Sequence, residues 1–252
     1  MQTTSAFSSF SDYSMLAATS TTLILSVVFF LLSHQNSKTY MMFWGASWLI
    51  CSATFILDFI NMYHVLDTVN YLMLRQAATT LEAFLFLLAT CSFFRIAVGK
   101  VFLMLPFISI ATIMLYPLSE NAVSLFTVPN IMLCSGMIIY SGCLFMEVSW
   151  TENLPEKYVA SGLILVWSIF INHFGFTMRN ALWSLVAYFG GIATVNVLMI
   201  VMIIIFFKRL RFVDSLISSR FRMLVENSSN CMFLYDYTSD KFQYASKRIH
   251  EM

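Results

Sequence analysis

The stretch MLAATSTTLILSVVFFLLS, residues 15–33, contains no charged side chain. About 20 consecutive apolar residues in a helix cross the hydrocarbon core of a bilayer, so this stretch predicts a membrane-spanning helix. The rest of the chain has the same character, because 59% of its 252 residues are hydrophobic and only 11% are charged. Soluble domains carry roughly 25% charged residues. The sequence therefore predicts an integral membrane protein.

Six further apolar segments follow the first, with short polar connections between them. They cover residues 40–57, 72–94, 101–118, 122–146, 158–178 and 181–207. The second segment is expected to end at Asp58. Short connections favour antiparallel packing of neighbouring helices. The fold class predicted is an all-α membrane protein, a bundle of seven transmembrane helices over residues 15–207.

Basic side chains are distributed unequally between the two sides of this bundle. Lysine and arginine gather in the cytoplasmic loops of membrane proteins. If the N-terminus lies outside, seven of them are inside and two are outside. The inner ones are Lys38, Arg95, Lys100, Lys157, Lys208, Arg209 and Arg211, and the outer ones are Arg75 and Arg179. We therefore predict an extracytoplasmic tail over residues 1–14, a cytoplasmic C-terminus and a location in the cell inner membrane.

Composition narrows the function classes further. A formal net charge of +1 provides no field for binding nucleic acid. The five cysteines form no CxxC pair, which favours small buried thiols over metal or redox centres. The sequence contains no P-loop, no nucleotide-binding glycine box and no phosphoacceptor helix. We expect no catalytic residue, no metal and no cofactor in these 252 residues.

One carboxylate lies deep within a predicted span. Glu82 is near the middle of residues 72–94, where a charged group costs about 2.5–3.5 kcal/mol on insertion scales. Thr79 and Arg75 share its helix face, one and two turns toward the outside. Arg75 is about 10.5 Å along the helix from Glu82. Asp58, at the outer end of the preceding span, is therefore the better partner for Arg75.

Polar residues in the last two spans complete a candidate ligand site. Two of them lie near the outer end of the sixth span and one lies near the middle of the seventh. The candidate ligand-binding residues are Arg75, Thr79, Glu82, Asn172, His173 and Asn196. They predict an outward-opening pocket between the third, sixth and seventh helices. The alternative is that they are interhelical hydrogen-bond partners, each worth about 0.6 kcal/mol.

Most tryptophan side chains fall near the predicted membrane interfaces. The set is Trp44, Trp48, Trp150, Trp167 and Trp183, together with Tyr40, Tyr71, Tyr140 and Tyr158, and most of these are interpreted in this way. Indole rings favour the headgroup region because they combine an apolar body with a polar N–H group. We therefore expect these side chains to act mainly as interfacial anchors.

The composition changes at Lys208. Residues 208–226 are charged, and they carry apolar side chains at spacings of 3, 4, 4 and 3, which is a short heptad seam. The seam residues are Leu210, Val213, Ile217, Phe221 and Leu224. No Gly or Pro interrupts the chain there, so one helix is expected to run from the seventh span through this linker. The seam lies on its own protein or on lipid headgroups, or it pairs with a second copy in a parallel coil.

Residues 227–252 combine strand and turn signals. Cys231–Tyr235 reads as a buried strand, and Lys241–Tyr244 alternates polar and aromatic side chains as a second strand. Thr238–Asp240 supplies the turn between them. A helix, a turn and a β-hairpin in this order, with LVENS (224–228), MFLYD (232–236) and YAS (244–246), resemble the opening of a PAS domain. The resemblance covers about the last 30 residues and implies a truncated α+β segment, so we expect the chain to be a fragment.

Seven spans, a linking helix and a PAS domain resemble bacterial membrane sensors. In that family the output is usually a histidine kinase and sometimes a diguanylate cyclase. The resemblance implies a homodimeric sensory module in the lipid bilayer. It would bind an unknown small-molecule or peptide ligand, either external or dissolved in the membrane. The signal would pass through the seventh helix and the linker to a cytoplasmic output domain or response regulator.

Other seven-helix classes lack their defining residues. A microbial rhodopsin needs a lysine within its last span, and Lys208 lies beyond it. A G-protein-coupled receptor needs an acidic-Arg-Tyr motif where this chain has Phe93-Phe94-Arg95. Two alternatives remain, a proton-coupled secondary transporter using Glu82 and a passive membrane anchor for a sensing PAS domain. The linker helix argues against the transporter. The polar stripe formed by Arg75, Thr79 and Glu82 on one helix face argues against the anchor.

Overall fold

The long apolar runs form helices, because a helix satisfies its own backbone N–H and C=O groups where lipid offers no partner. The computed structural model describes the backbone of residues 2–63, 65–114, 122–147, 155–176, 181–226, 233–236 and 241–245. It describes the side chains of residues 15–61, 63, 65–114, 127–147, 155–170, 189–221, 223 and 224.

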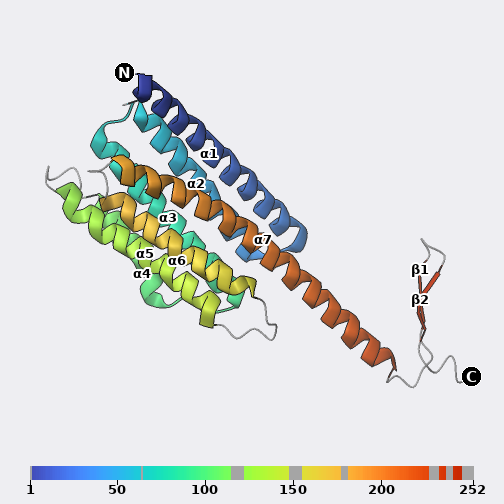
Figure 1. The fold of residues 1–252 in the computed structure, drawn as a ribbon. Coiled ribbons are helices and arrows are strands. Elements are labelled where there is room, and N and C mark those ends of the chain that lie inside the picture. Colours follow the sequence, from blue (N-terminus) through green and yellow to red (C-terminus); the bar gives the residue numbers. More distant parts are fainter. Residues whose placement is uncertain are drawn as a thin grey trace, which may run out of the picture. The chain divides into compact units, whose positions relative to one another are not determined.

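Seven helices and one β-hairpin make up the described part of the chain (Figure 1). The helices are α1 (Gln2–Asn36), α2 (Thr39–Met62), α3 (Thr68–Phe94), α4 (Lys100–Ile113), α5 (Ala122–Glu147), α6 (Glu156–Phe176) and α7 (Ala181–Glu226). The strands are β1 (Phe233–Asp236) and β2 (Lys241–Ala245). The chain divides into two units, Met1–Met202 and Ile203–Met252.

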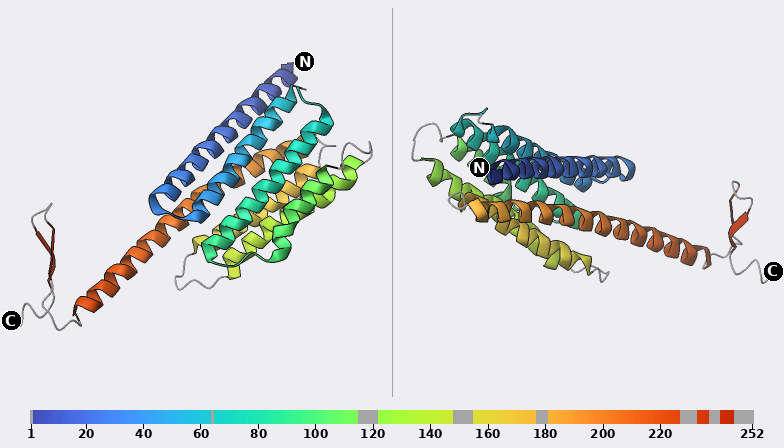
Figure 2. Two further views of the ribbon diagram at one scale, coloured as in Figure 1. Left: turned by 180° about the vertical axis from the view of Figure 1, so that it is seen from behind. Right: turned by 45° about the horizontal axis from the view of Figure 1, so that its top comes forward.

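In the first unit, α3 occupies a central position. The first three helices pack in chain order, with α1 on α2 and α2 on α3 (Figure 2). On its other side α3 contacts both α4 and α5, and α5 packs against α6. Helix α3 is therefore the element whose side chains can connect the two sides of this unit. Its N-terminus is capped by the Asp67 carboxylate, which accepts a hydrogen bond of 3.3 Å from the backbone N–H of Val69.

Five helices are long and apolar enough to cross a membrane in the described part of the chain. The segments are Met15–Asn36, Thr39–Asn61, Thr68–Phe94, Thr127–Glu147 and Phe189–Phe221. Helix α4 is a shorter apolar helix of 14 residues. The chain is therefore a helical, multi-pass membrane protein. The count of seven spans stays a prediction.

Some boundaries differ from those expected from the sequence. Helix α2 continues past Asp58 to Met62, because the Asp58 carboxylate is paired inside the protein and does not need to leave the helix for water. Helix α4 ends at Ile113, and residues 115–118 of the predicted fourth span lie outside the described residues. The predicted N-terminal tail is part of α1 from Gln2 onward.

The prediction of interfacial tryptophans is wrong for three of them. Trp44, Trp48 and Trp167 are at most 4% exposed. The ring of Trp48 lies 5.9 Å from that of Phe86 and 5.5 Å from that of Trp167, measured between centroids. These rings pack against one another between α2, α3 and α6, and such aromatic pairs add to the stability gained from burial. Trp150 and Trp183 lie outside the described side chains.

The second unit contains the C-terminal part of α7 and the hairpin. Helix α7 runs without a break from Ala181 to Glu226, which confirms that the linker continues the seventh helix. The strands β1 and β2 pair antiparallel, with Phe233 opposite Ala245 and Asp236 opposite Lys241. The predicted hairpin is therefore confirmed over these residues, while Cys231 and Met232 lie outside the described part.

The ring of Phe170 on α6 packs directly against Gly190 of α7. A Cβ atom added to Gly190 would lie 2.5 Å from Cζ of Phe170. We expect Gly190→Ala to destabilise the protein by about 1–3 kcal/mol, the usual cost of overpacking. Gly136→Ala on α5 is the matched control, because a Cβ atom there meets nothing within 4 Å. Thermal unfolding in detergent should show a lower midpoint for Gly190→Ala alone, and equal midpoints for both variants would contradict the close contact.

Candidate functional site

Helix α3 carries polar side chains on two faces, and each face contacts a different helix. Tyr71, Arg75 and Glu82 contact α2, whereas Gln76 and Thr80 contact residues of α4 and α5. Both sets lie within the membrane-spanning segment Thr68–Phe94. Polar groups at membrane depth are usually directed to the protein interior and paired there. The two faces of α3 are therefore the candidate site.

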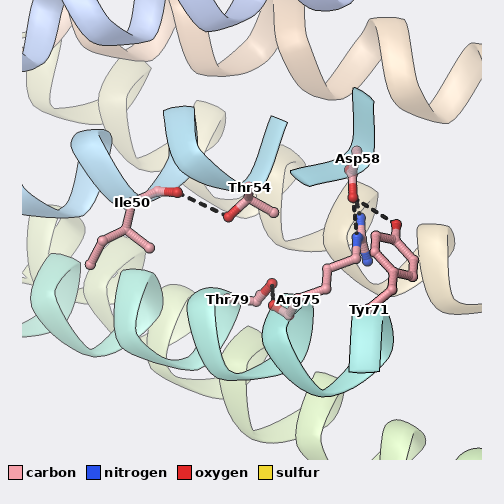
Figure 3. Close-up of polar contacts among 6 residues, drawn as sticks. All are labelled: Ile50, Thr54, Asp58, Tyr71, Arg75 and Thr79. Carbon is pink, nitrogen blue, oxygen red and sulfur yellow. Dashed lines mark hydrogen bonds and ion pairs between the residues drawn. The ribbon is translucent and has the colours of Figure 1, made fainter. Parts of the chain in front are cut away.

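The N-terminal end of the first face of α3 is built around Asp58 (Figure 3). Arg75 donates from Nε to Asp58 Oδ1 at 2.8 Å and from Nη2 to Asp58 Oδ2 at 3.4 Å. The Tyr71 hydroxyl donates to Asp58 Oδ1 at 2.7 Å. The side chain of Asp58 is 6% exposed and that of Arg75 is 18% exposed. The predicted pairing of Arg75 with Asp58 is confirmed, and it joins α2 to α3.

Glu82 lies further along the same face, toward the middle of the membrane. It is 6% exposed, and its side chain interacts with the thiol of Cys51 on α2. The Ser47 hydroxyl donates to the backbone carbonyl of Glu82 at 3.0 Å. Between Glu82 and Arg75, the Thr79 hydroxyl donates to the backbone carbonyl of Arg75 at 2.9 Å. Arg75 and Glu82 of the predicted polar stripe therefore face α2, whereas the Thr79 hydroxyl bonds within α3.

The other half of the predicted pocket is described only in part. The side chains of Asn172 and His173 lie outside the described residues, although both positions fall within α6. Asn196 on α7 is half-buried, and its Oδ1 atom is buried with no hydrogen-bond partner among the described residues. Arg75 and Glu82 both bond to side chains of α2. A pocket between the third, sixth and seventh helices therefore stays a prediction.

A second polar system, on the opposite face of α3, was not predicted from the sequence. Gln76, Thr80, Ser109 and Asn130 are each at most 4% exposed. The Asn130 Nδ2 donates to Gln76 Oε1 at 2.6 Å, and Thr80 Oγ1 lies 3.2 Å from Asn130 Oδ1. The hydroxyl oxygens of Thr80 and Ser109 are 2.9 Å apart, and Ser109 also donates to Asn130 Oδ1. We call these four residues the α3–α4–α5 network.

A sequence signal for this network existed but was weak. Gln76 and Thr80 are four residues apart, so they share one face of α3, and Asn130 follows a proline inside an apolar helix. Uncharged polar residues are common in membrane helices, however, and their partners are far away in the chain. Gln76 and Asn130 are 54 residues apart. Only the packing of three helices brings these side chains together.

The chemistry of the two faces differs. The α2-facing side combines an ion pair with a buried carboxyl and a thiol, whereas the network contains only uncharged groups. Among the described residues, no three His, Cys, Asp or Glu side chains gather in a way that could hold a metal ion. Cys51, Cys91, Cys134 and Cys143 are free thiols.

No protein-family model, no curated protein and no solved structure matches this chain.

The Asp58–Arg75 pair should be strongly coupled in stability. Removing one partner of a buried pair leaves the other charge uncompensated, so Asp58→Asn and Arg75→Gln should each lower the free energy of unfolding by roughly 3 kcal/mol. In the double variant neither charge remains, and the loss should be smaller than the sum of the two single losses. Denaturation in detergent measures all three values.

Asp67→Asn is the control for this cycle. Asp67 is an exposed acid nearby, and asparagine caps a helix N-terminus about as well as aspartate. Its free energy of unfolding should stay unchanged. Additive losses at Asp58 and Arg75 would show that the ion pair contributes nothing to holding α2 against α3.

Proposed function

We propose that this chain is the membrane-embedded input module of a bacterial signal-transduction protein. It would bind an external or membrane-dissolved ligand and transmit the signal through α7 to a cytoplasmic output domain. The observation that carries the proposal is the continuity of α7. One helix of 46 residues extends from the membrane unit to the segment before the hairpin. A change made among the membrane helices can therefore shift or rotate the linker directly.

The length of α7 supports this role. A helix of 46 residues is about 69 Å long, and the hydrocarbon core of a bilayer is about 30 Å thick. The excess carries the linker, residues 208–226, well beyond the end of the span. A transporter or a simple anchor has no need of a rigid extension of this length. A sensor needs one, because a shift of one to two Å at a helix interface is enough to bias a two-state element.

The seam on this extension supports a second copy as its partner. Val213, Ile217, Phe221 and Leu224 are between 43% and 73% exposed in the single chain, and Leu210 is half-buried. Apolar side chains at heptad spacing are covered when two such helices pair in parallel. A two-fold axis along the membrane normal brings the same seam from both copies together. We therefore propose a homodimer through the linker.

The hairpin supports the identity of the domain that follows. Strands β1 and β2 follow the linker helix in the order expected at the opening of a PAS domain, and a register irregularity lies between Leu234 and Tyr235. In this proposal residues 227–252 are the first part of that domain. A histidine kinase is the first choice for the output, and a diguanylate cyclase is the second.

The proposed topology has seven spans with the N-terminus outside, in the cell inner membrane. Helices α4 and α6 would be the two spans added to the five long apolar helices, and the bias of basic residues supports the orientation. In cells, a membrane-impermeant thiol reagent should label a cysteine at Gln2 but not one at Arg211. A cysteine at Arg211 should become reactive after lysis. Labelling of both positions in intact cells would contradict the seven-span topology.

Two other functions compete with this one. A proton-coupled transporter would use Glu82 as its carrier, and a passive anchor would use none of the membrane polar residues. Glu82 is a carboxyl buried inside the membrane unit, and a passive anchor has no need of one. The continuous linker helix supports a sensor over a transporter. An experiment that measures the pairing of the linker helices with and without a change at Glu82 distinguishes the three functions.

Cysteine crosslinking along the linker provides this experiment. In a chain without native cysteines, single cysteines at residues 210–224 should form disulfides between copies. The maxima should fall at the seam positions Leu210, Val213, Ile217, Phe221 and Leu224. Arg211 and Ser215, on the opposite side of the helix, are the matched controls and should crosslink weakly. Glu82→Gln should change the profile without lowering the amount of folded protein, since a sensor couples the membrane core to the linker.

Two results would contradict the proposal in different ways. Maxima at Arg211 and Ser215 would mean that the seam packs elsewhere and that the homodimer is wrong. An unchanged profile in Glu82→Gln, together with normal maxima at the seam, would favour the passive anchor. If the chain is a transporter, Glu82→Gln should instead abolish the proton-coupled uptake of its substrate into vesicles.

A further inference from the structure

Helix α4 contacts the rest of its unit through a narrow stripe of side chains. Its buried residues are Pro106, Ser109 and Ile113, which recur about once per turn. The exposed residues of α4 are mostly apolar, and Val101 and Phe107 are each 72% exposed. At 14 residues it is about 21 Å long, shorter than the hydrocarbon core. Little apolar area therefore holds α4 in place. The structure describes every side chain of α4, and among them Ser109 is the one buried polar group.

Ser109 is the member of the α3–α4–α5 network that belongs to α4. A hydroxyl group has one hydrogen to donate and two lone pairs that accept. The Ser109 hydroxyl donates to Asn130 Oδ1, so its oxygen is available to accept from Thr80, 2.9 Å away. One side chain thus connects α4 to both α3 and α5.

The network remains satisfied if Ser109 leaves it. The Thr80 hydroxyl has two other acceptors within reach, Asn130 Oδ1 at 3.2 Å and the backbone carbonyl of Gln76 at 2.8 Å. Asn130 keeps its hydrogen bond to Gln76 at 2.6 Å. The hydroxyl of a serine within a helix can itself bond to a carbonyl of the preceding turn. Neither side is left with an unpaired polar group in lipid, so release costs only the difference between the two interhelical hydrogen bonds of Ser109 and the local bonds that replace them.

We propose that α4 is a releasable helix and that Ser109 is the latch that holds it against α3 and α5. The latch is a conformational device, because two arrangements with satisfied hydrogen bonds are what a two-state element requires. Gln76 follows Arg75 directly in α3, so the network and the Asp58–Arg75 pair are carried by the same turn of helix. This inference does not depend on the proposed sensor function, because its test measures helix release and not signalling.

Cys134 provides a native reporter of the latch. It is 0% exposed, lies one turn from Asn130 on α5, and its Sγ atom is 3.7 Å from Thr80 Oγ1. The experiment uses the full chain in membranes with Cys134 as its only cysteine and measures its rate of reaction with N-ethylmaleimide. We expect Ser109→Ala to accelerate the reaction roughly three- to tenfold, the effect of losing one or two interhelical hydrogen bonds in a membrane.

Two controls make the result decisive. Thr112→Ala removes a hydroxyl group from the same helix. That hydroxyl donates to the backbone carbonyl of Ser109 at 2.7 Å, a hydrogen bond within α4, so Thr112→Ala should leave the reaction rate of Cys134 unchanged. A chain with Cys91 as its only cysteine reports general loosening, because Cys91 is 1% exposed and lies near the other end of α3. Its rate should not respond to Ser109→Ala. Equal acceleration by Ser109→Ala and Thr112→Ala, no acceleration at all, or equal acceleration at Cys91 would each overturn the latch.

Discussion

The interior of a bilayer offers no water, so a polar group placed there is stabilised mainly by a partner within the protein. This constraint organises α3, which carries polar side chains on two faces through a membrane-spanning segment. On one face, Asp58 receives hydrogen bonds from Arg75 and Tyr71. On the other, Gln76 accepts a hydrogen bond from Asn130. The neighbours of α3 are therefore selected by hydrogen bonding as well as by apolar packing.

The two faces differ in what they can do. An ion pair between α2 and α3 is costly to separate, because either charge left alone in lipid has no compensation. The uncharged network that includes Ser109 can lose one member and still satisfy the others. One side of α3 is therefore suited to a permanent contact and the other to a contact that opens. A protein that transmits a conformational change across a membrane needs both kinds.

Several features could be predicted from residue types and spacing. Arg75 lies about 10.5 Å along the helix from Glu82, so Asp58 at the end of the neighbouring span was predicted to be its partner. The absence of Gly and Pro around Lys208 correctly predicted a single helix through the linker. The tryptophans were misjudged, because Trp48 has the same amphipathic ring whether it lies at an interface or inside a bundle. Its burial depends on Phe86 and Trp167, which come from other helices.

The sequence by itself determined that this chain is a helical membrane protein, because the length and hydropathy of a segment decide whether it partitions into lipid. It also determined the continuity of α7, because helix propagation depends on local residues. Only the tertiary structure decided which uncharged polar groups meet. Thr80, Ser109 and Asn130 lie on three helices, and a hydrogen bond between them exists only within about 3.5 Å. Such a distance depends on how whole helices pack, which no local pattern encodes.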